Sequence, residues 1–214
     1  MIKRTTLTDF SIFILCSSAI CFSCCLLFEP ITYQAQGDFS AYLDLARQIY
    51  HLPGATAEDL SHRSPLYSLI LGLFVIVFGE SHYVIAMMVF QYVLICFSSL
   101  IIYKIILHLT GKSSVAFVAG LTGTLNLATI YFGFMMLSEI LAMSLFMLTV
   151  WSLLKYYQEG KPAAVAFAGI TAGLLILARY NMIGMPLVIL VVITIVNIVE
   201  REQFKIVPVV RDVA

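Results

Sequence analysis

The sequence predicts an all-α polytopic membrane protein. Of its 214 residues, 61% are hydrophobic and only 11% are charged, whereas soluble domains carry about 25% charged residues. Apolar runs long enough to cross a bilayer recur along the chain. The 12 basic and 12 acidic residues balance, so the composition gives no support for a nucleic-acid partner. These observations exclude a soluble globular domain and a disordered chain.

The first apolar run covers residues 10–28 and follows the basic pair Lys3 and Arg4. A basic start before an apolar run is also typical of signal peptides, which end in a small-x-small cleavage site. No such site stands out here, and the run is long enough to span. We therefore interpret it as an uncleaved anchor. With no organelle signal, it suggests a bacterial inner membrane.

The cysteines do not form a disulfide framework, because all five lie in apolar runs. Cys21 and Cys24 have the spacing of a redox or metal pair, but no second pair or histidine cluster accompanies them. We interpret them as small buried apolar residues.

One later apolar run is too short to cross a membrane. The later runs cover residues 65–79, 83–107, 115–137, 140–154, 163–178 and 182–199. The run over 65–79 makes about 22 Å of helix against a hydrocarbon core of about 30 Å. It begins at Pro65 and ends at Gly79 and Glu80, which are boundary signals. We expect it to lie in or dip into the interface, which leaves about six spanning helices.

The distribution of lysine and arginine supports this topology. If 65–79 does not cross, the cations on the outside are only Arg47, Arg63 and Arg179. Those inside are Lys3, Arg4, Lys104, Lys112, Lys155, Lys161, Arg201, Lys205 and Arg211. If 65–79 crosses, every later loop changes side and the excess is reversed. Since cytoplasmic loops carry the excess of basic residues, the first topology is favoured and both termini are predicted to be cytoplasmic.

This topology organises the chain as one membrane domain, 1–214. Residues 10–28 form the first span, 29–82 an external loop, 83–199 five further spans and 200–214 a cytoplasmic tail. The external loop contains an amphipathic pattern with apolar residues at helical spacing, which predicts a short helix on the outer membrane surface. These apolar positions are Phe39, Tyr42, Leu43, Ala46, Ile49 and Tyr50.

Charged groups next to a bilayer are costly and are therefore functional candidates. The topology places Asp38, Glu139 and Arg179 on the outer face, with Arg63 in the same external loop. Each also has a structural interpretation, which stays open. Asp38 could cap its helix, Glu139 could stabilise a helix N-terminus, and Arg179 could extend to the lipid headgroups.

A metal site is not predicted. His51 and His62 lie in the external loop without the spacing of a metal motif. Lys104, His108 and Lys112 are interpreted as marking the cytoplasmic membrane edge.

The predicted outer-face residues suit one chemistry. A carboxylate at a membrane surface can deprotonate an acceptor hydroxyl. An arginine can bind a lipid phosphate in bidentate geometry and stabilise the charge on a phosphate leaving group. Asp38 and Glu139 are therefore candidate catalytic residues, and Arg179 and Arg63 are candidate ligands for a donor phosphate.

Three stretches resemble integral-membrane glycosyltransferases of the GT-C superfamily. They are the first-loop run Gly37-Asp38-Phe39-Ser40 with Arg63-Ser64-Pro65-Leu66-Tyr67, then Leu137-Ser138-Glu139-Ile140-Leu141, and Gly173-Leu174-Leu175-Ile176-Leu177-Ala178-Arg179. The closest group is the protein mannosyltransferase and aminoarabinose-transferase relatives, with the Rgt-like lipopolysaccharide enzymes. The resemblance extends over roughly residues 10–199. One departure is Tyr180, where the family usually has proline after the arginine.

The resemblance implies hexosyl or pentosyl transfer from a polyprenyl-phosphate-sugar donor to a lipid, glycan or protein acceptor on the external face. It matches Asp38 to the first-loop acid, Glu139 to the second acid and Arg179 to the basic position near the donor phosphate. It implies no cofactor and metal-independent transfer, although some members of the superfamily use a divalent metal.

Two alternatives remain open at this level. Members of the family are generally longer, so the chain matches their N-terminal module. It could be a truncated product, a fragment or half of a split enzyme, inactive alone. It could instead be a non-catalytic membrane subunit or a small transporter-like helix bundle. A transporter should carry charges deep in its spans, whereas the polar groups there are mild, such as Gln91 and Asn126.

Overall fold

Every regular element in the described part of the chain is a helix, which confirms the all-α membrane class. The computed structural model describes residues 12–13, 15–17, 19, 38–54, 63–195 and 197–198. The predicted span over 10–28 lies largely outside these residues, and His62 and the tail 200–214 lie wholly outside them. The elements are α2 (Asp38–Tyr50), α3 (Pro65–Thr110), α4 (Ser113–Leu125), α5 (Leu127–Phe134), α6 (Ser138–Glu159), α7 (Pro162–Ala178) and η1 (Tyr180–Gly184), followed by a helix over 185–195.

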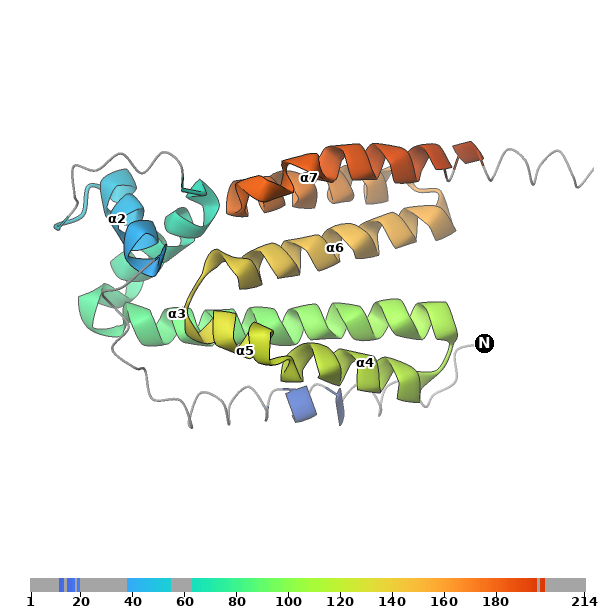
Figure 1. Cartoon of the computed structure of the whole chain (residues 1–214), viewed down its shortest axis with the longest axis horizontal. Helices are drawn as coiled ribbons and strands as arrows, with labels where there is room; N and C mark the ends of the chain where they lie inside the picture. Colours follow the sequence, from blue (N-terminus) through green and yellow to red (C-terminus); the bar gives the residue numbers. More distant parts are fainter. Residues whose placement is uncertain are drawn as a thin grey trace, which may run out of the picture.

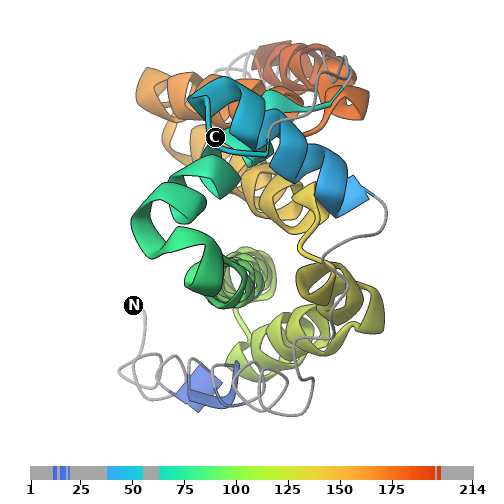
Figure 2. The same ribbon diagram turned by 90° about the vertical axis from the view of Figure 1, so that its left-hand side faces the viewer.

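The long helices run back and forth along one axis (Figure 1). The second half of α3 runs away from α2, α4 and α5 return, α6 runs away again, and α7 returns. As a result the start of α6 and the end of α7 lie at the end of the bundle where α2 lies. We call this the α2 end. Seen from there, α2 and residues 65–78 lie across the ends of the longer helices (Figure 2).

α3 is two helices joined at Gly79, as the short apolar run predicted. Gly79 has φ 71° and ψ 170°, a region that is essentially open only to glycine. Residues 65–78 therefore leave the direction of residues 80–110, which extend for about 46 Å at 1.5 Å per residue. This length exceeds the predicted run of 83–107.

Among the described residues, α3 and α6 are long and apolar enough to cross a membrane, and α4 with α5 would make a third span if the bent pair crosses as one. α7 and the helix over 180–195 are apolar but shorter. The predicted run over 115–137 is not one helix, because α4 and α5 meet at a bend of 47°. Asn126 stands at this bend and caps α5, since its Oδ1 accepts hydrogen bonds from the backbone N–H groups of Ala128 (2.9 Å) and Thr129 (3.4 Å).

α2 is the predicted amphipathic helix, and its apolar side packs on α3. Its buried residues are Phe39, Tyr42, Leu43 and Ala46. Ile49 was predicted on the same side but is exposed. The close approach needs Gly72, because a Cβ atom there would lie 2.3 Å from the Tyr50 ring. Tyr50 also donates a hydrogen bond to the carbonyl of Leu69 at 3.2 Å.

Hydroxyl pairs join the long helices. Ser98 on α3 and Ser144 on α6 lie 2.8 Å apart, and so do Thr149 on α6 and Thr171 on α7. All four residues are buried. Small residues that share hydrogen bonds let apolar helices approach closely where no hydrophobic effect drives them together. Packing and these hydrogen bonds therefore hold the long helices together and fix the helix ends that meet at the α2 end.

Candidate functional site

Two of the ion pairs at the α2 end join the residues predicted as site residues. Arg63 Nη1 is 2.7 Å from Asp38 Oδ1, and Arg179 Nη1 is 2.7 Å from Glu139 Oε1. Each predicted acid therefore pairs with one predicted arginine. The sequence contained the four residues but no indication of these partners, because the pairs join elements far apart along the chain.

The backbone explains why these side chains meet. Asp38 opens α2 and Glu139 lies in the first turn of α6, where a carboxylate interacts favourably with the helix dipole. Arg179 ends α7 in extended conformation before η1. Arg63 precedes Ser64 and Pro65, which begin α3. Both acids lie in the first turn of a helix, and for Glu139 this agrees with its structural interpretation as an acid at a helix N-terminus.

A polar cavity of about 270 Å³ contains both ion pairs. Its lining consists of Asp38, Tyr42, Arg63, Ser64, Ser138, Glu139, Arg179, Tyr180 and Asn181. The Asp38 side chain is 58% exposed, whereas that of Glu139 is 24% exposed. The two carboxylates therefore differ in environment, and Asp38 is the more accessible to a second substrate.

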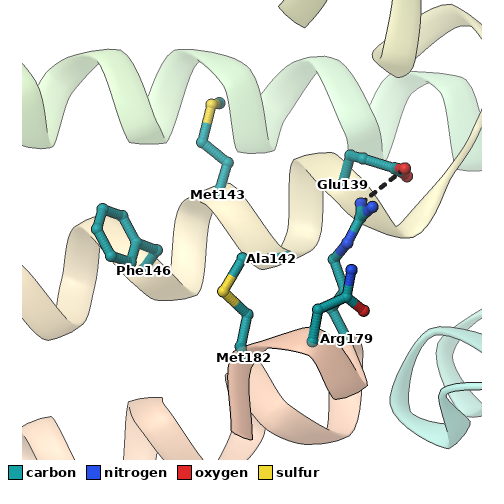
Figure 3. Close-up of a pocket in the computed structure, with 7 residues that line it drawn as sticks. Glu139, Ala142, Met143, Phe146, Arg179 and Met182 are labelled. Carbon is teal, nitrogen blue, oxygen red and sulfur yellow. Dashed lines mark ion pairs between the residues drawn. The ribbon is translucent and has the colours of Figure 1, made fainter. Parts of the chain in front are cut away.

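An apolar cavity of about 370 Å³ adjoins the polar one. The two share Glu139, Arg179 and Asn181, and the apolar cavity continues along α6 past Ala142, Met143 and Phe146, with Met182 on the other side. Figure 3 shows the Glu139–Arg179 pair at one end of this cavity and Phe146 at the other. The ion pair therefore stands where polar and apolar surfaces meet.

Arg63 retains hydrogen-bonding capacity. Its Nε is buried and has no hydrogen-bond partner among the described residues. Its guanidinium carbon lies 5.7 Å from the centre of the Tyr42 ring, within the range of a cation–π contact. Because the guanidinium carries five N–H donors and the Arg63 side chain is 26% exposed, Arg63 can hold Asp38 through Nη1 and still donate to an anion through its second Nη group.

Five residues that line the polar cavity were not predicted as site residues: Tyr42, Ser64, Ser138, Tyr180 and Asn181. The Tyr42 hydroxyl lies 3.0 Å from Ser138 Oγ. Their distance in sequence from the predicted acids could have indicated both residues. Ser138 directly precedes Glu139, and Tyr42 follows Asp38 by one helical turn and so shares its face. Asn181 lies in η1, two residues after Arg179, and this proximity in sequence was its signal.

The described residues contain no group of three or more histidine, cysteine, aspartate or glutamate side chains that could hold a metal. His51 ends α2 in left-handed conformation, with φ 52°, and lines neither cavity. The site as described is therefore built from carboxylates, guanidinium groups, hydroxyls and one amide.

A family model described as dolichyl-phosphate-mannose-protein mannosyltransferase matches residues 62–209. The matched segment contains Arg63, Glu139 and Arg179 and begins after Asp38. No curated protein and no solved structure matches the chain.

Proposed function

Because the chain belongs to the dolichyl-phosphate-mannose-protein mannosyltransferase family, we propose that it transfers a sugar from a polyprenyl-phosphate-linked donor to an acceptor hydroxyl at the external face of a bacterial inner membrane. The observation that carries this proposal is the Glu139–Arg179 ion pair shared by a polar and an apolar cavity. A lipid-linked sugar has the same division, with a charged phosphate between a polar sugar and an apolar chain.

In this proposal each part of the donor binds in the cavity of matching polarity. The isoprenoid chain lies against Met143, Phe146 and Met182, where burial of apolar surface contributes about 25 cal/mol per Å². Arg179 and Arg63 bind the phosphate, and the sugar occupies the polar cavity. The charges of the two acids and the two arginines in the site cancel. A bound phosphate therefore gives the site a net negative charge, and it competes with Asp38 and Glu139 for the two guanidinium groups.

Transfer then proceeds by displacement at the anomeric carbon. Asp38, the more exposed acid, accepts the proton of the acceptor hydroxyl, whose oxygen forms the new bond to that carbon. The bond from the anomeric carbon to the phosphate oxygen breaks, and its electron pair leaves with the polyprenyl phosphate. Arg179 and Arg63 stabilise the charge that develops on the leaving group. Glu139 orients Arg179 toward the phosphate.

The charges of α6 and α7 favour this activity over transport. α7 contains no charged residue, and those of α6 lie near its ends, as Glu139, Lys155 and Glu159. A transporter would require ionisable groups near the middle of its spans. The arrangement suits chemistry at a membrane surface.

The test is sugar transfer by the chain in liposomes supplied with a radiolabelled polyprenyl-phosphate sugar. We expect Asp38→Asn to lower the rate at least about 100-fold, the usual contribution of a general base, while membrane insertion is unchanged. Asp44→Asn is the matched control, since Asp44 lies on α2 and lines neither cavity. Full transfer by an inserted Asp38→Asn protein would remove Asp38 from the mechanism.

A further inference from the structure

The turn that precedes Glu139 has an unusual backbone. Met136 has φ 51°, which is the left-handed region that residues other than glycine rarely adopt. It is buried, and it is followed by Leu137 and Ser138, which begin α6. Such a conformation persists only where the surroundings over-determine it.

Two buried side chains from the two halves of α3 hold the carbonyls of this turn. The Tyr67 hydroxyl donates a hydrogen bond to the carbonyl of Met136. Gln91 Nε2 donates to the Tyr67 oxygen at 3.1 Å and to the carbonyl of Leu137 at 2.9 Å. Tyr67 and Gln91 are both 0% exposed. Two successive carbonyls thus have side-chain donors fixed by the packing around them.

α2 adds a third contact to the next residue. The Tyr42 hydroxyl lies 3.0 Å from Ser138 Oγ, and the Tyr42 ring packs edge-on against Tyr67 with centroids 5.0 Å apart. Side chains from α2, residues 65–78 and residues 80–110 therefore converge on residues 136–138. The residue that follows them is Glu139, which pairs with Arg179 at 2.7 Å.

We propose that Tyr67 and Gln91 are positioning residues that act through Glu139. By holding the carbonyls of Met136 and Leu137, they fix the direction of the Glu139 carboxylate and so the place of the Arg179 guanidinium between the two cavities. The effect on transfer rests on the proposed function, whereas the effect on the turn does not. Neither residue lines either cavity, so neither needs to touch the substrate.

The structural part is tested by hydrogen exchange in detergent. We expect Tyr67→Phe, which keeps the ring and removes the donor, to speed amide exchange in residues 137–141 about tenfold, the equivalent of one lost hydrogen bond. Peptides from α7 should exchange as before. Tyr103→Phe is the matched control, because Tyr103 is a buried tyrosine of the other core cluster. Unchanged exchange at 137–141 would overturn the proposal.

The catalytic part is tested by a double-mutant cycle on kcat with Tyr67→Phe and Glu139→Asp. If Tyr67 acts through Glu139, Tyr67→Phe lowers kcat about tenfold in the wild-type chain and has little further effect beside Glu139→Asp. Equal losses in both backgrounds would show a general structural role and overturn the proposal. If Tyr67→Phe does not fold, Gln91→Met takes its place in both experiments. If the wild-type chain transfers no sugar, the proposed function fails. Hydrogen exchange then still tests whether Tyr67 and Gln91 hold the turn before Glu139.

Discussion

Arg179 Nη1 lies 2.7 Å from Glu139 Oε1, which joins the end of α7 to the start of α6 at the boundary between a polar and an apolar cavity. Both side chains are partly exposed, at 31% and 24%. The pair is therefore accessible to a ligand from either cavity. An anionic headgroup that arrives there can take over the guanidinium from the carboxylate.

This arrangement predicts that Arg179→Gln weakens donor binding. We expect the KM for the donor to rise at least about tenfold, because a hydrogen bond to a charged group contributes about 1.5–3 kcal/mol. Arg179→Lys should recover part of the loss, since it restores the charge without the bidentate geometry. The measurement is the initial transfer rate against donor concentration. Lys155→Gln, at the opposite end of α6, is the control. Equal KM values for Arg179→Gln and wild type would contradict the role of Arg179.

The apolar cavity predicts a dependence on the length of the donor chain. Phe146→Ala should raise the KM for a long-chain donor about fivefold or more, since the side chain contributes apolar surface at about 25 cal/mol per Å². A donor with a chain too short to reach Phe146 should show little change. Phe167→Ala is the control, because Phe167 is an exposed phenylalanine on α7 that lines neither cavity. The same KM change for both donors would argue against an isoprenoid site there.

The packing of α2 predicts different effects for two glycine substitutions. A Cβ at Gly72 would lie 2.3 Å from the Tyr50 ring, whereas nothing lies within 4 Å of one at Gly169. Gly72→Ala should destabilise the docked α2 by about 1–3 kcal/mol, the usual cost of overpacking. Gly169→Ala should be neutral or stabilising, by up to about 1 kcal/mol of helix propensity. Thermal unfolding in detergent measures both. Equal unfolding temperatures for the two variants would mean that Tyr50 moves without cost.

The orientation predicted from the basic residues implies opposite labelling of the two ends of the bundle. An impermeant thiol reagent applied outside intact cells should modify Ile183→Cys, in η1 at the α2 end, and leave Tyr157→Cys unmodified until the membrane is opened. Both positions are exposed, and the wild-type chain gives the background from its own cysteines. The reverse pattern would place the site on the cytoplasmic side and remove the support for an external acceptor.

Composition and hydrophobic pattern were enough to predict the class of fold, the helix of α2 and the boundary at Gly79. These features depend on local rules: apolar content, helical spacing and the conformations open to glycine. The same rules did not predict the bend of 47° within the run over 115–137. The Asn126 side chain hydrogen-bonds to the first backbone N–H groups of α5 and so competes with continuation of α4 through this point. Hydrophobicity alone does not reveal this competition.

The candidate acids and arginines were also visible in the sequence, because charges beside apolar runs are few. Their pairing was not, since Asp38 with Arg63 and Glu139 with Arg179 depends on how helices return to one end of the bundle. The donors from Tyr67 and Gln91 to the turn before Glu139 were hidden for the same reason. Hydrogen bonds between distant segments depend on which segments pack together. The pattern of residue types along the sequence does not specify that packing.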